Sequence, residues 1–284
     1  MMSHSNISSS GSTRTAGTYL SKDGQILKIK GIYVMLENCK WNSLSHAVEN
    51  GQKKSKVKKN DLLISFSYSN AKLKDTEEVK FIQWNILAVE TCPFRTQLCG
   101  GYDEKGRINC YAKKSERYPS CRKRREIHTE VSKMENFVEM MINQIEYELK
   151  CTKKVIFFRI HESGDFYNYE YLEKWYHITK HFEGNSRIVF EAYTKSLPYF
   201  DKLYQKYGKD SVNMKVLSSI WADTKPEMVE LTEKLGLKVY TATEAKNIDK
   251  FLQENPSYEK CTCENCGKCK KCYVENINLI VAIH

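Results

Sequence analysis

The chain has 284 residues, of which 41% are hydrophobic and 28% charged, a composition typical of a globular protein. This length is enough for one large α/β domain or two smaller ones, each with a substantial core. No apolar run approaches the roughly 20 residues that cross a bilayer, which excludes a membrane-spanning protein. The formal net charge of +10 fits a polyanionic partner such as nucleic acid, and it fits a role in solubility equally well.

Residues 1–21 are rich in Ser, Thr and Gly and lack the apolar core of a secretory signal. We therefore expect a disordered leader and a cytoplasmic protein. Residues 22–90 are predicted to form a small, β-rich and basic N-terminal region, with strands over 25–36 and 61–67. A lysine-dense loop between these strands contains five candidate nucleic-acid-binding side chains: Lys53, Lys54, Lys56, Lys58 and Lys59.

Residues 91–284 are predicted to form an α/β domain that carries the clustered cysteines. Apolar residues at three- and four-residue spacing predict a helix over 126–150. Strands are then expected over 155–160, 187–193, 214–220, 237–242 and 278–283, and helices over 169–182, 198–207, 226–235 and 244–253. This alternation favours a parallel βα-repeat sheet, which we expect to form a partial or distorted (β/α) barrel.

Ligand chemistry in such a sheet is expected at the carboxyl ends of the strands. His161, Glu162 and Asp165 follow the first strand of the repeat, and Lys195 follows the second. These four residues are the candidate catalytic groups, although Asp165 could instead cap the next helix. The segment 193–196 could hold an anion, or it could form only the turn between a strand and a helix.

The chain contains 11 cysteines, and most of them fall in two short windows. Without an export signal, this clustering favours metal binding over disulfide bonds. The C-terminal group consists of Cys261, Cys263, Cys266, Cys269 and Cys272. Its short spacers let a loop wrap an iron–sulfur cluster, whereas zinc could take two pairs of thiolates. The absence of histidine from this group favours the iron–sulfur cluster.

The upstream group supplies three thiolates, from Cys92, Cys99 and Cys110. Three thiolates on a [4Fe-4S] cluster leave one iron open to a small molecule or to a side chain from elsewhere. Cys121 could be a fourth ligand or an ordinary buried thiol, and a zinc knuckle that holds a long loop is the alternative for the group. The sequence thus predicts one or two [4Fe-4S] clusters, with zinc as the alternative metal.

Motifs in a fixed order between residues 84 and 272 resemble the phage "gene product 88" family. They are Cys92-Pro93, Cys99, Cys110-Tyr111-Ala112, the basic stretch over 117–120, the segment FRIHESGDF over 158–166 and the segment AYTKS over 192–196. The resemblance covers most of the folded chain. It implies a bacterial protein associated with phages or mobile elements, whose biochemical role is poorly defined.

A more distant similarity is to radical S-adenosylmethionine enzymes. These enzymes place three cysteines in a loop near the start of a partial (β/α) barrel, often ending in Cys-Tyr, and Cys110-Tyr111 matches that ending. The spacing differs, because six and ten residues separate the cysteines here, where that superfamily usually has three and two. The segment over 162–165 is a loose counterpart of the glycine-rich segment that binds the cofactor's amino group. The similarity implies an open-iron cluster and S-adenosylmethionine as a candidate cofactor.

A second basic run follows the upstream cysteines. Its candidate nucleic-acid-binding residues are Arg122, Lys123, Arg124 and Arg125. Tyr111 and Tyr118 lie nearby in the sequence, as aromatic residues do in nucleic-acid-binding proteins, although a solvated helix start has the same composition.

Three functions are compatible with these patterns. The first is a nucleic-acid-binding protein whose cluster is structural or senses redox state, and the cysteine spacing favours it. The second is a radical S-adenosylmethionine-like enzyme, and the third is a structural protein stabilised by zinc.

Overall fold

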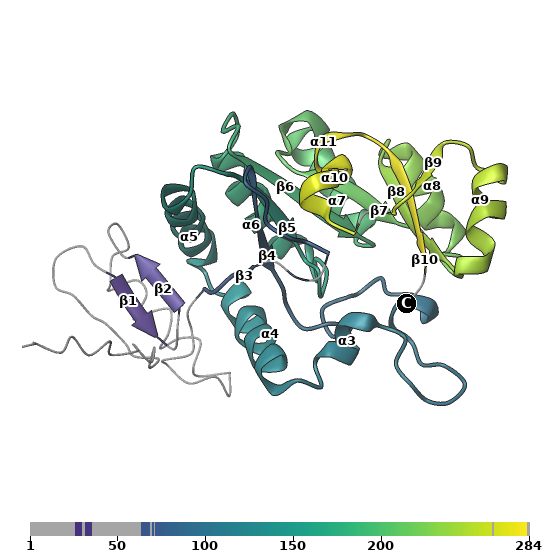
Figure 1. Ribbon diagram of the computed structural model, residues 1–284, viewed down its shortest axis with the longest axis horizontal. Helices are drawn as coiled ribbons and strands as arrows, with labels where there is room; N and C mark the ends of the chain where they lie inside the picture. The colour runs from purple at the N-terminus through teal and green to yellow at the C-terminus, as the bar shows by residue number, and fades with distance from the viewer. Residues whose placement is uncertain are drawn as a thin grey trace, which may run out of the picture.

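The computed structural model describes residues 26–29, 32–35, 64–68, 70, 72–262 and 264–282. The strands of its main sheet are β3 (Ser67–Tyr68), β4 (Val79–Trp84), β5 (Val155–Ile160), β6 (Ile188–Thr194), β7 (Lys215–Ser219), β8 (Lys238–Thr243), β9 (Tyr258–Lys260) and β10 (Asn278–Ala282). They form one eight-stranded sheet in the order β3-β4-β5-β6-β7-β8-β10-β9. Neighbouring strands are parallel except for β3, which is antiparallel to β4 (Figure 1).

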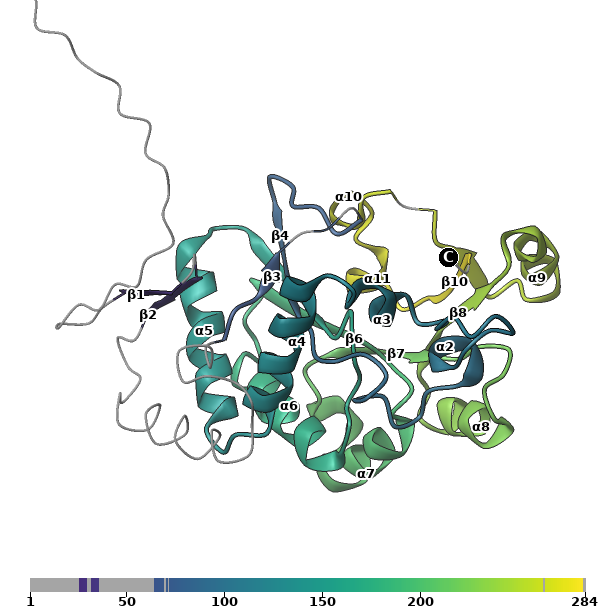
Figure 2. The ribbon, with the colours of Figure 1, turned by 90° about the horizontal axis from the view of Figure 1, so that it is seen from below.

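The longer helices connect the strands. They are α4 (Pro119–Ser132), α5 (Phe137–Cys151), α6 (Tyr169–His181), α7 (Leu197–Tyr207), α8 (Pro226–Lys234) and α9 (Ile248–Glu254). Of these, α4 to α8 cover one face of the sheet. Short helices are α2 (Gln97–Gly100), α3 (Tyr111–Ser115), α10 (Cys266–Cys269) and α11 (Lys271–Val274), with 3₁₀ turns η2 (Lys209–Ser211) and η3 (Ala245–Asn247). Figure 2 shows α5, α6 and α7 on one side of the sheet and α10 and α11 on the other.

Alternation along the strands supplies both faces of the sheet with apolar side chains. Phe158 and Phe190 face the helices and belong to the main core, together with Trp175 of α6. Phe81 and Phe157 face the other way and form a second cluster with Tyr273 of α11. The rings of Phe157 and Tyr273 are stacked, with centroids 4.4 Å apart. Near the chain's C-terminus, α11 thus covers the amino-terminal half of this second face and leaves its carboxyl end open.

The predicted α/β class and the parallel βα repeat are confirmed, and each strand and helix expected from residue 155 onward has a counterpart. Within the described ranges no pairing joins β3 to β9, so the sheet does not close, and the predicted partial or distorted barrel is not confirmed. The single helix predicted over 126–150 is wrong, because α4 ends at Ser132 and α5 begins at Phe137. The ammonium group of Lys174 on α6 donates to the carbonyls of Ser132 and Met134 and so satisfies the end of α4.

The N-terminal region contributes to the main sheet, since β3 and β4 lie before residue 90, the expected domain boundary. The strand predicted over 25–36 is two antiparallel strands, β1 (Ile26–Ile29) and β2 (Ile32–Met35). The expected leader, the lysine-dense loop over 51–60 and Cys263 lie outside the described residues. In the part of the chain that the structure describes, no helix has the length and apolar character needed to cross a membrane.

Candidate functional site

A cavity of about 300 Å³ lies at the carboxyl ends of the parallel strands. Its wall includes His161 after β5, Lys195 after β6, Ser219 at the end of β7 and Ala242 near the end of β8. All four candidate catalytic residues, Glu162 and Asp165 included, line it. The prediction that these groups gather at one edge of the sheet is therefore confirmed, and ligands are expected at this edge in such folds.

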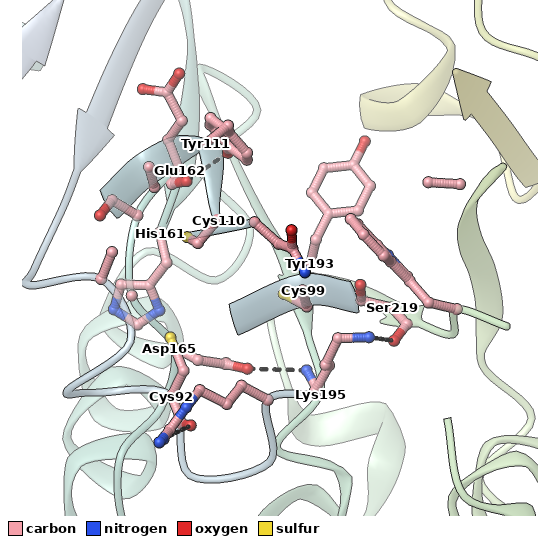
Figure 3. A pocket seen from close by; sticks show the side chains of 18 of the residues that line it. Cys92, Cys99, Cys110, Tyr111, His161, Glu162, Asp165, Tyr193, Lys195 and Ser219 are labelled. Carbon is pink, nitrogen blue, oxygen red and sulfur yellow. Dashed lines mark hydrogen bonds between the residues drawn. The ribbon is translucent and has the colours of Figure 1, made fainter. Parts of the chain in front are cut away.

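The three upstream cysteines line the same cavity. They come from the loop after β4: Cys92 lies in a turn, Cys99 lies in α2, and Cys110 is the N-cap residue of α3. In Figure 3 their sulfur atoms surround a space between the imidazole of His161 and the ammonium group of Lys195. Residues that are 18 positions apart in the sequence thus share one wall.

Hydrogen bonds within the loop bring the second and third cysteines together. The backbone amide of Asn109 donates to the carbonyl of Gly101 at 2.9 Å, and its side-chain amide donates to the carbonyl of Gln97 at 2.9 Å. Farther back, the amide of Ala88 donates to the buried carboxylate of Glu116 at 2.8 Å. The loop is therefore attached at both ends, which fixes the positions of its thiols.

Burial raises the pKa values of two of these thiols, Cys92 and Cys99. It raises the pKa of Cys92 well above its usual value and that of Cys99 to about 11. Each thiolate would also repel its neighbours, while the ammonium group of Lys195 lowers the pKa of Cys99. Cys92 and Cys99 are therefore thiols at neutral pH, and a bound metal would have to displace their protons.

Cys92, Cys99 and Cys110 are the side chains around this cavity that could bind a metal as thiolates. As the side chains stand, the described residues contain no group of three His, Cys, Asp or Glu side chains close enough to hold one metal ion. A four-iron cluster would place its irons at separate corners, so three thiolates bound to it would lie farther apart than the ligands of one zinc ion.

His161 is a neutral donor fixed by its neighbours. The indole of Trp84 donates to Oη of Tyr171 at 3.0 Å, and Nε2 of His161 lies 2.8 Å from the same oxygen. The buried hydroxyl of Tyr171 must donate its hydrogen to an acceptor, and Nε2 of His161 is in position to accept it. The imidazole hydrogen is therefore on Nδ1. Burial lowers the pKa of His161 to about 3, so the ring is uncharged at neutral pH.

The carboxylate of Asp165 has a structural role, because both of its oxygens accept hydrogen bonds from neighbouring loops. Its Oδ1 accepts hydrogen bonds from the Thr194 hydroxyl and the Phe166 amide, and its Oδ2 accepts one from the Lys195 amide at 2.9 Å. These bonds connect the loop after β5 to the loop after β6. The neighbouring Gly164 has φ +85°, and a Cβ there would lie 2.3 Å from the Ile86 side chain, so this close approach requires glycine.

Lys195 extends across the cavity wall. Its ammonium group donates to the carbonyl of Ser219 at 2.6 Å and lies 5.3 Å from the ring centroid of Trp221. Burial lowers the pKa of Lys195, while Cys99 and Asp223 act to raise it. The residue is therefore a positioned cation close to the cysteines.

Arg159 was not among the predicted site residues, yet it lines the cavity from within β5. Its Nη1 is 2.8 Å from the buried carboxylate of Glu191, and its guanidinium lies 3.5 Å from the ring centroid of Tyr193. The signal in the sequence is an arginine inside the otherwise apolar strand VIFFRI. A charge at such a position indicates a polar cavity behind the strand.

A family model described as gene product 88 matches residues 51–275, well over half of the chain. The chain belongs to the gene product 88 family. No curated protein and no solved structure matches it. The cavity and its three cysteines all lie within the matched range of this family member.

The C-terminal cysteines of this family member occupy a different place. Cys266 and Cys272 pack against the second apolar cluster beneath α10 and α11. Burial raises the pKa of Cys272 to about 12, and the sulfur of Cys261 accepts from the Lys72 ammonium group at 3.3 Å. None of the four described cysteines of this group lines the cavity, so the group is separate from the upstream cysteines.

The second basic run lies on α4, and its members differ in accessibility. Arg122 is exposed and pairs with Glu126, and Arg124 donates to the hydroxyl of Ser67. Arg125 is buried and donates to the carbonyl of Ala112 at 2.6 Å. Arg125 therefore stabilises the cysteine loop and is not available to a partner on the surface.

Proposed function

We propose that this chain is an iron–sulfur enzyme in which Cys92, Cys99 and Cys110 hold a [4Fe-4S] cluster with one iron open to a small molecule in the same cavity. The observation that carries the proposal is the shared position of the three cysteines at the carboxyl ends of the parallel strands. A purely structural cluster would not require a cavity beside its ligands. S-adenosylmethionine is the first ligand to test.

The cavity wall supports this proposal through its charge and its hydrogen bonds. Lys195 places its amino group near Cys99, where its positive charge would favour a thiolate ligand. His161 provides a neutral donor and Asp165 fixes two of the wall's loops to each other. A bound cluster with an open iron would supply electrons and a coordination position for the small molecule.

The chain's own residues would then orient the ligand and limit access by water. Tyr111 donates from its hydroxyl to the carbonyl of Glu162 at 2.6 Å, which attaches α3 over the loop after β5. Glu162 in turn accepts a hydrogen bond from Asn70 at 2.9 Å. These contacts close one side of the cavity, next to Cys110.

The C-terminal cysteines extend the proposal to a second cluster or a zinc ion. Cys261, Cys266, Cys269 and Cys272 are the described cysteines of this group, and short spacers separate the last three. A metal held there would attach the chain's end to the sheet. Its chemistry would be structural, because the small-molecule cavity is lined by the other set.

Anaerobic reconstitution followed by iron, sulfide and zinc analysis tests the proposal. About four irons and four sulfides support one cluster, and about eight of each support two. Addition of S-adenosylmethionine to the reduced protein should change its electron paramagnetic resonance spectrum. Zinc without sulfide, in protein handled without oxygen, would overturn the proposal.

Single alanine variants separate the two cysteine sets. Replacing Cys92, Cys99 or Cys110 should remove one cluster and abolish the spectral response, whereas Cys272→Ala should leave that response intact. Cys151 is exposed at the end of α5 and lies in neither set, so Cys151→Ala is the matched control. Loss of the response in the control variant as well would contradict the assignment.

Nucleic-acid binding is the second candidate function. The observation that favours it is the exposed ring of Tyr118 at the start of α4, with the guanidinium of Arg117 lying 4.9 Å from its centroid. Exposed aromatic rings beside cations bind single-stranded nucleic acid by stacking and by charge. The cluster enzyme remains the main proposal, because neither Arg117 nor Tyr118 lines the cavity that the three cysteines share.

A further inference from the structure

The wall of the cavity contains buried polar groups that lack hydrogen-bond partners. Buried polar groups in folded proteins almost always have partners, so each exception calls for a water, an ion or a ligand. Three residues of the cavity wall have a buried nitrogen without a partner among the described residues: Nε of Arg159, Nδ1 of His161 and Nε1 of Trp221. No side-chain oxygen of the cavity wall is buried without a partner among the described residues.

All three nitrogens are donors. Arginine and tryptophan carry only N–H groups, and the contact between His161 and Tyr171 assigns the imidazole hydrogen to Nδ1. A ligand that satisfies these groups must offer acceptors, because a donor facing a donor leaves both unpaired. An apolar or donor-rich molecule would leave this part of the wall unsatisfied.

The charged side chains of the cavity wall also favour a ligand with acceptor groups. Four cations line the cavity, Arg95, Lys114, Arg159 and Lys195, against two acidic residues, Glu162 and Asp165. The carboxylate of Asp165 is already saturated by the donors of two loops. The accessible balance is therefore positive, which favours an anion.

Two of the donors are held in place before any ligand binds. Glu191 and the ring of Tyr193 fix the guanidinium of Arg159, and its side chain stays 17% exposed. The ammonium group of Lys195 lies over the Trp221 ring. A planar guanidinium fixed in this way matches the geometry of a carboxylate or a phosphate.

We propose that the cavity binds a small molecule bearing a carboxylate or phosphate group, with Arg159, His161 and Trp221 as its donors. The site is the cavity of the proposed function, and the proposal deepens that function by naming its ligand class. The recognition itself depends on protein groups alone. Metal-free protein should therefore bind the anion as well, more weakly than the reconstituted protein does.

Isothermal titration of the full-length chain with inorganic phosphate and with succinate tests the proposal and distinguishes its two sources. We expect a dissociation constant of about 1 mM or below for at least one anion. Preference for phosphate assigns the site to phosphoryl ligands, and preference for succinate assigns it to carboxylates. Absence of binding of both anions to the metal-free and to the reconstituted protein would overturn the proposal.

Variants connect binding to the named donors. Arg159→Gln alone leaves the buried Glu191 carboxylate without its cation, so the matched variant is Arg159→Gln with Glu191→Gln. This double variant should weaken anion binding more than about tenfold, and Trp221→Phe should weaken it by about three- to tenfold. Arg187→Gln, whose side chain donates to Thr152 at the opposite end of the sheet, should change nothing.

Unchanged binding in the double variant would also overturn the proposal. Iron and sulfide analysis of the same preparations keeps the two hypotheses apart. If the protein holds a cluster but binds no anion, this inference is wrong and the proposed function stands. If it binds an anion but holds no cluster, the proposed function is wrong and this inference stands.

Discussion

The backbone amide of Leu98 donates a hydrogen bond of 2.6 Å to Oδ2 of Asp223. This bond joins α2, which carries Cys99, to the loop after β7. The cysteine loop is therefore fastened to a distant strand as well as to its own ends. Its geometry depends on a residue that binds no metal in our proposal.

Replacing Asp223 by alanine should loosen the cysteine loop without removing a thiol. A hydrogen bond to a carboxylate contributes about 1.5 to 3 kcal/mol, so we expect chelators to remove iron from reconstituted Asp223→Ala at least several-fold faster. Asp223→Asn keeps an acceptor oxygen and should resemble the wild type. Equal release from the alanine and asparagine variants would show that this bond does not hold the loop.

Two buried histidines should make the fold sensitive to mild acid. Burial lowers the pKa values of both His128 and His161 from 6.5 to about 3, and the ring of His128 stacks on Trp84. Between pH 3 and 6.5 the unfolded chain binds these protons and the folded chain does not. Stability is therefore fully present above pH 6.5 and falls as the pH is lowered, by about 1.4 kcal/mol per pH unit for each histidine.

Urea unfolding at pH 7 and pH 5.5 measures this slope. Burial raises the pKa of Glu191, which acts in the opposite direction, so the variant His128→Gln isolates the contribution of one ring. Between these two pH values its free energy of unfolding should fall by about 1.2 kcal/mol less than that of the wild type. An unchanged slope would mean that His128 titrates normally in the folded chain.

The repeat of strands and helices could be predicted from the sequence because it depends on local patterns. The run VIFFRI and the apolar stripe of α6 are visible in the chain itself. The break between α4 and α5 could not be predicted, since the carbonyls of Ser132 and Met134 are satisfied by Lys174, 40 or more positions away. Long-range partners of this kind leave no local pattern.

The candidate site shows the same limit. Ligand-binding groups gather at the carboxyl ends of parallel strands, and this rule correctly predicted that His161 and Lys195 lie at one edge of the sheet. The rule follows from parallel topology alone. The role of Arg159 was missed, since its contacts with Glu191 and Tyr193 become visible only when β5 and β6 pair. Arg125 belongs to a basic run whose composition is typical of a binding surface. Its side chain is nevertheless buried, because α4 directs it toward the cysteine loop.

Tyr273 of α11 should be important for stability. It is buried against Phe157 and Phe81, at the end of the sheet away from the cavity. Tyr273→Ala leaves a large hole and should lower the free energy of unfolding by about 3 to 5 kcal/mol, whereas Tyr273→Phe keeps the stacked ring and should cost much less. Similar losses in thermal or urea unfolding for both variants would indicate that the hydroxyl, rather than the ring, is what matters.

The second candidate function makes a prediction that involves no cysteine. Arg122 and Arg124 are the arginines of the basic run on α4 whose side chains the structure leaves at the surface. If this surface binds single-stranded DNA, replacing both by glutamine should weaken binding and reduce the slope of log affinity against log salt by about 1.4, or about 0.7 for each lost phosphate contact. Fluorescence anisotropy with a labelled oligonucleotide over a series of salt concentrations measures both quantities.

The matched control for this experiment removes two charges elsewhere. Lys180 lies in the last turn of α6 and Arg187 directly before β6, so changing both to glutamine removes no residue of α4 and lowers the net charge equally. A loss confined to the α4 variant supports a defined binding surface. Equal losses of affinity in the two variants would show that the effect depends on net charge alone. They would remove the structural argument for nucleic-acid binding and leave the cluster proposal unchanged.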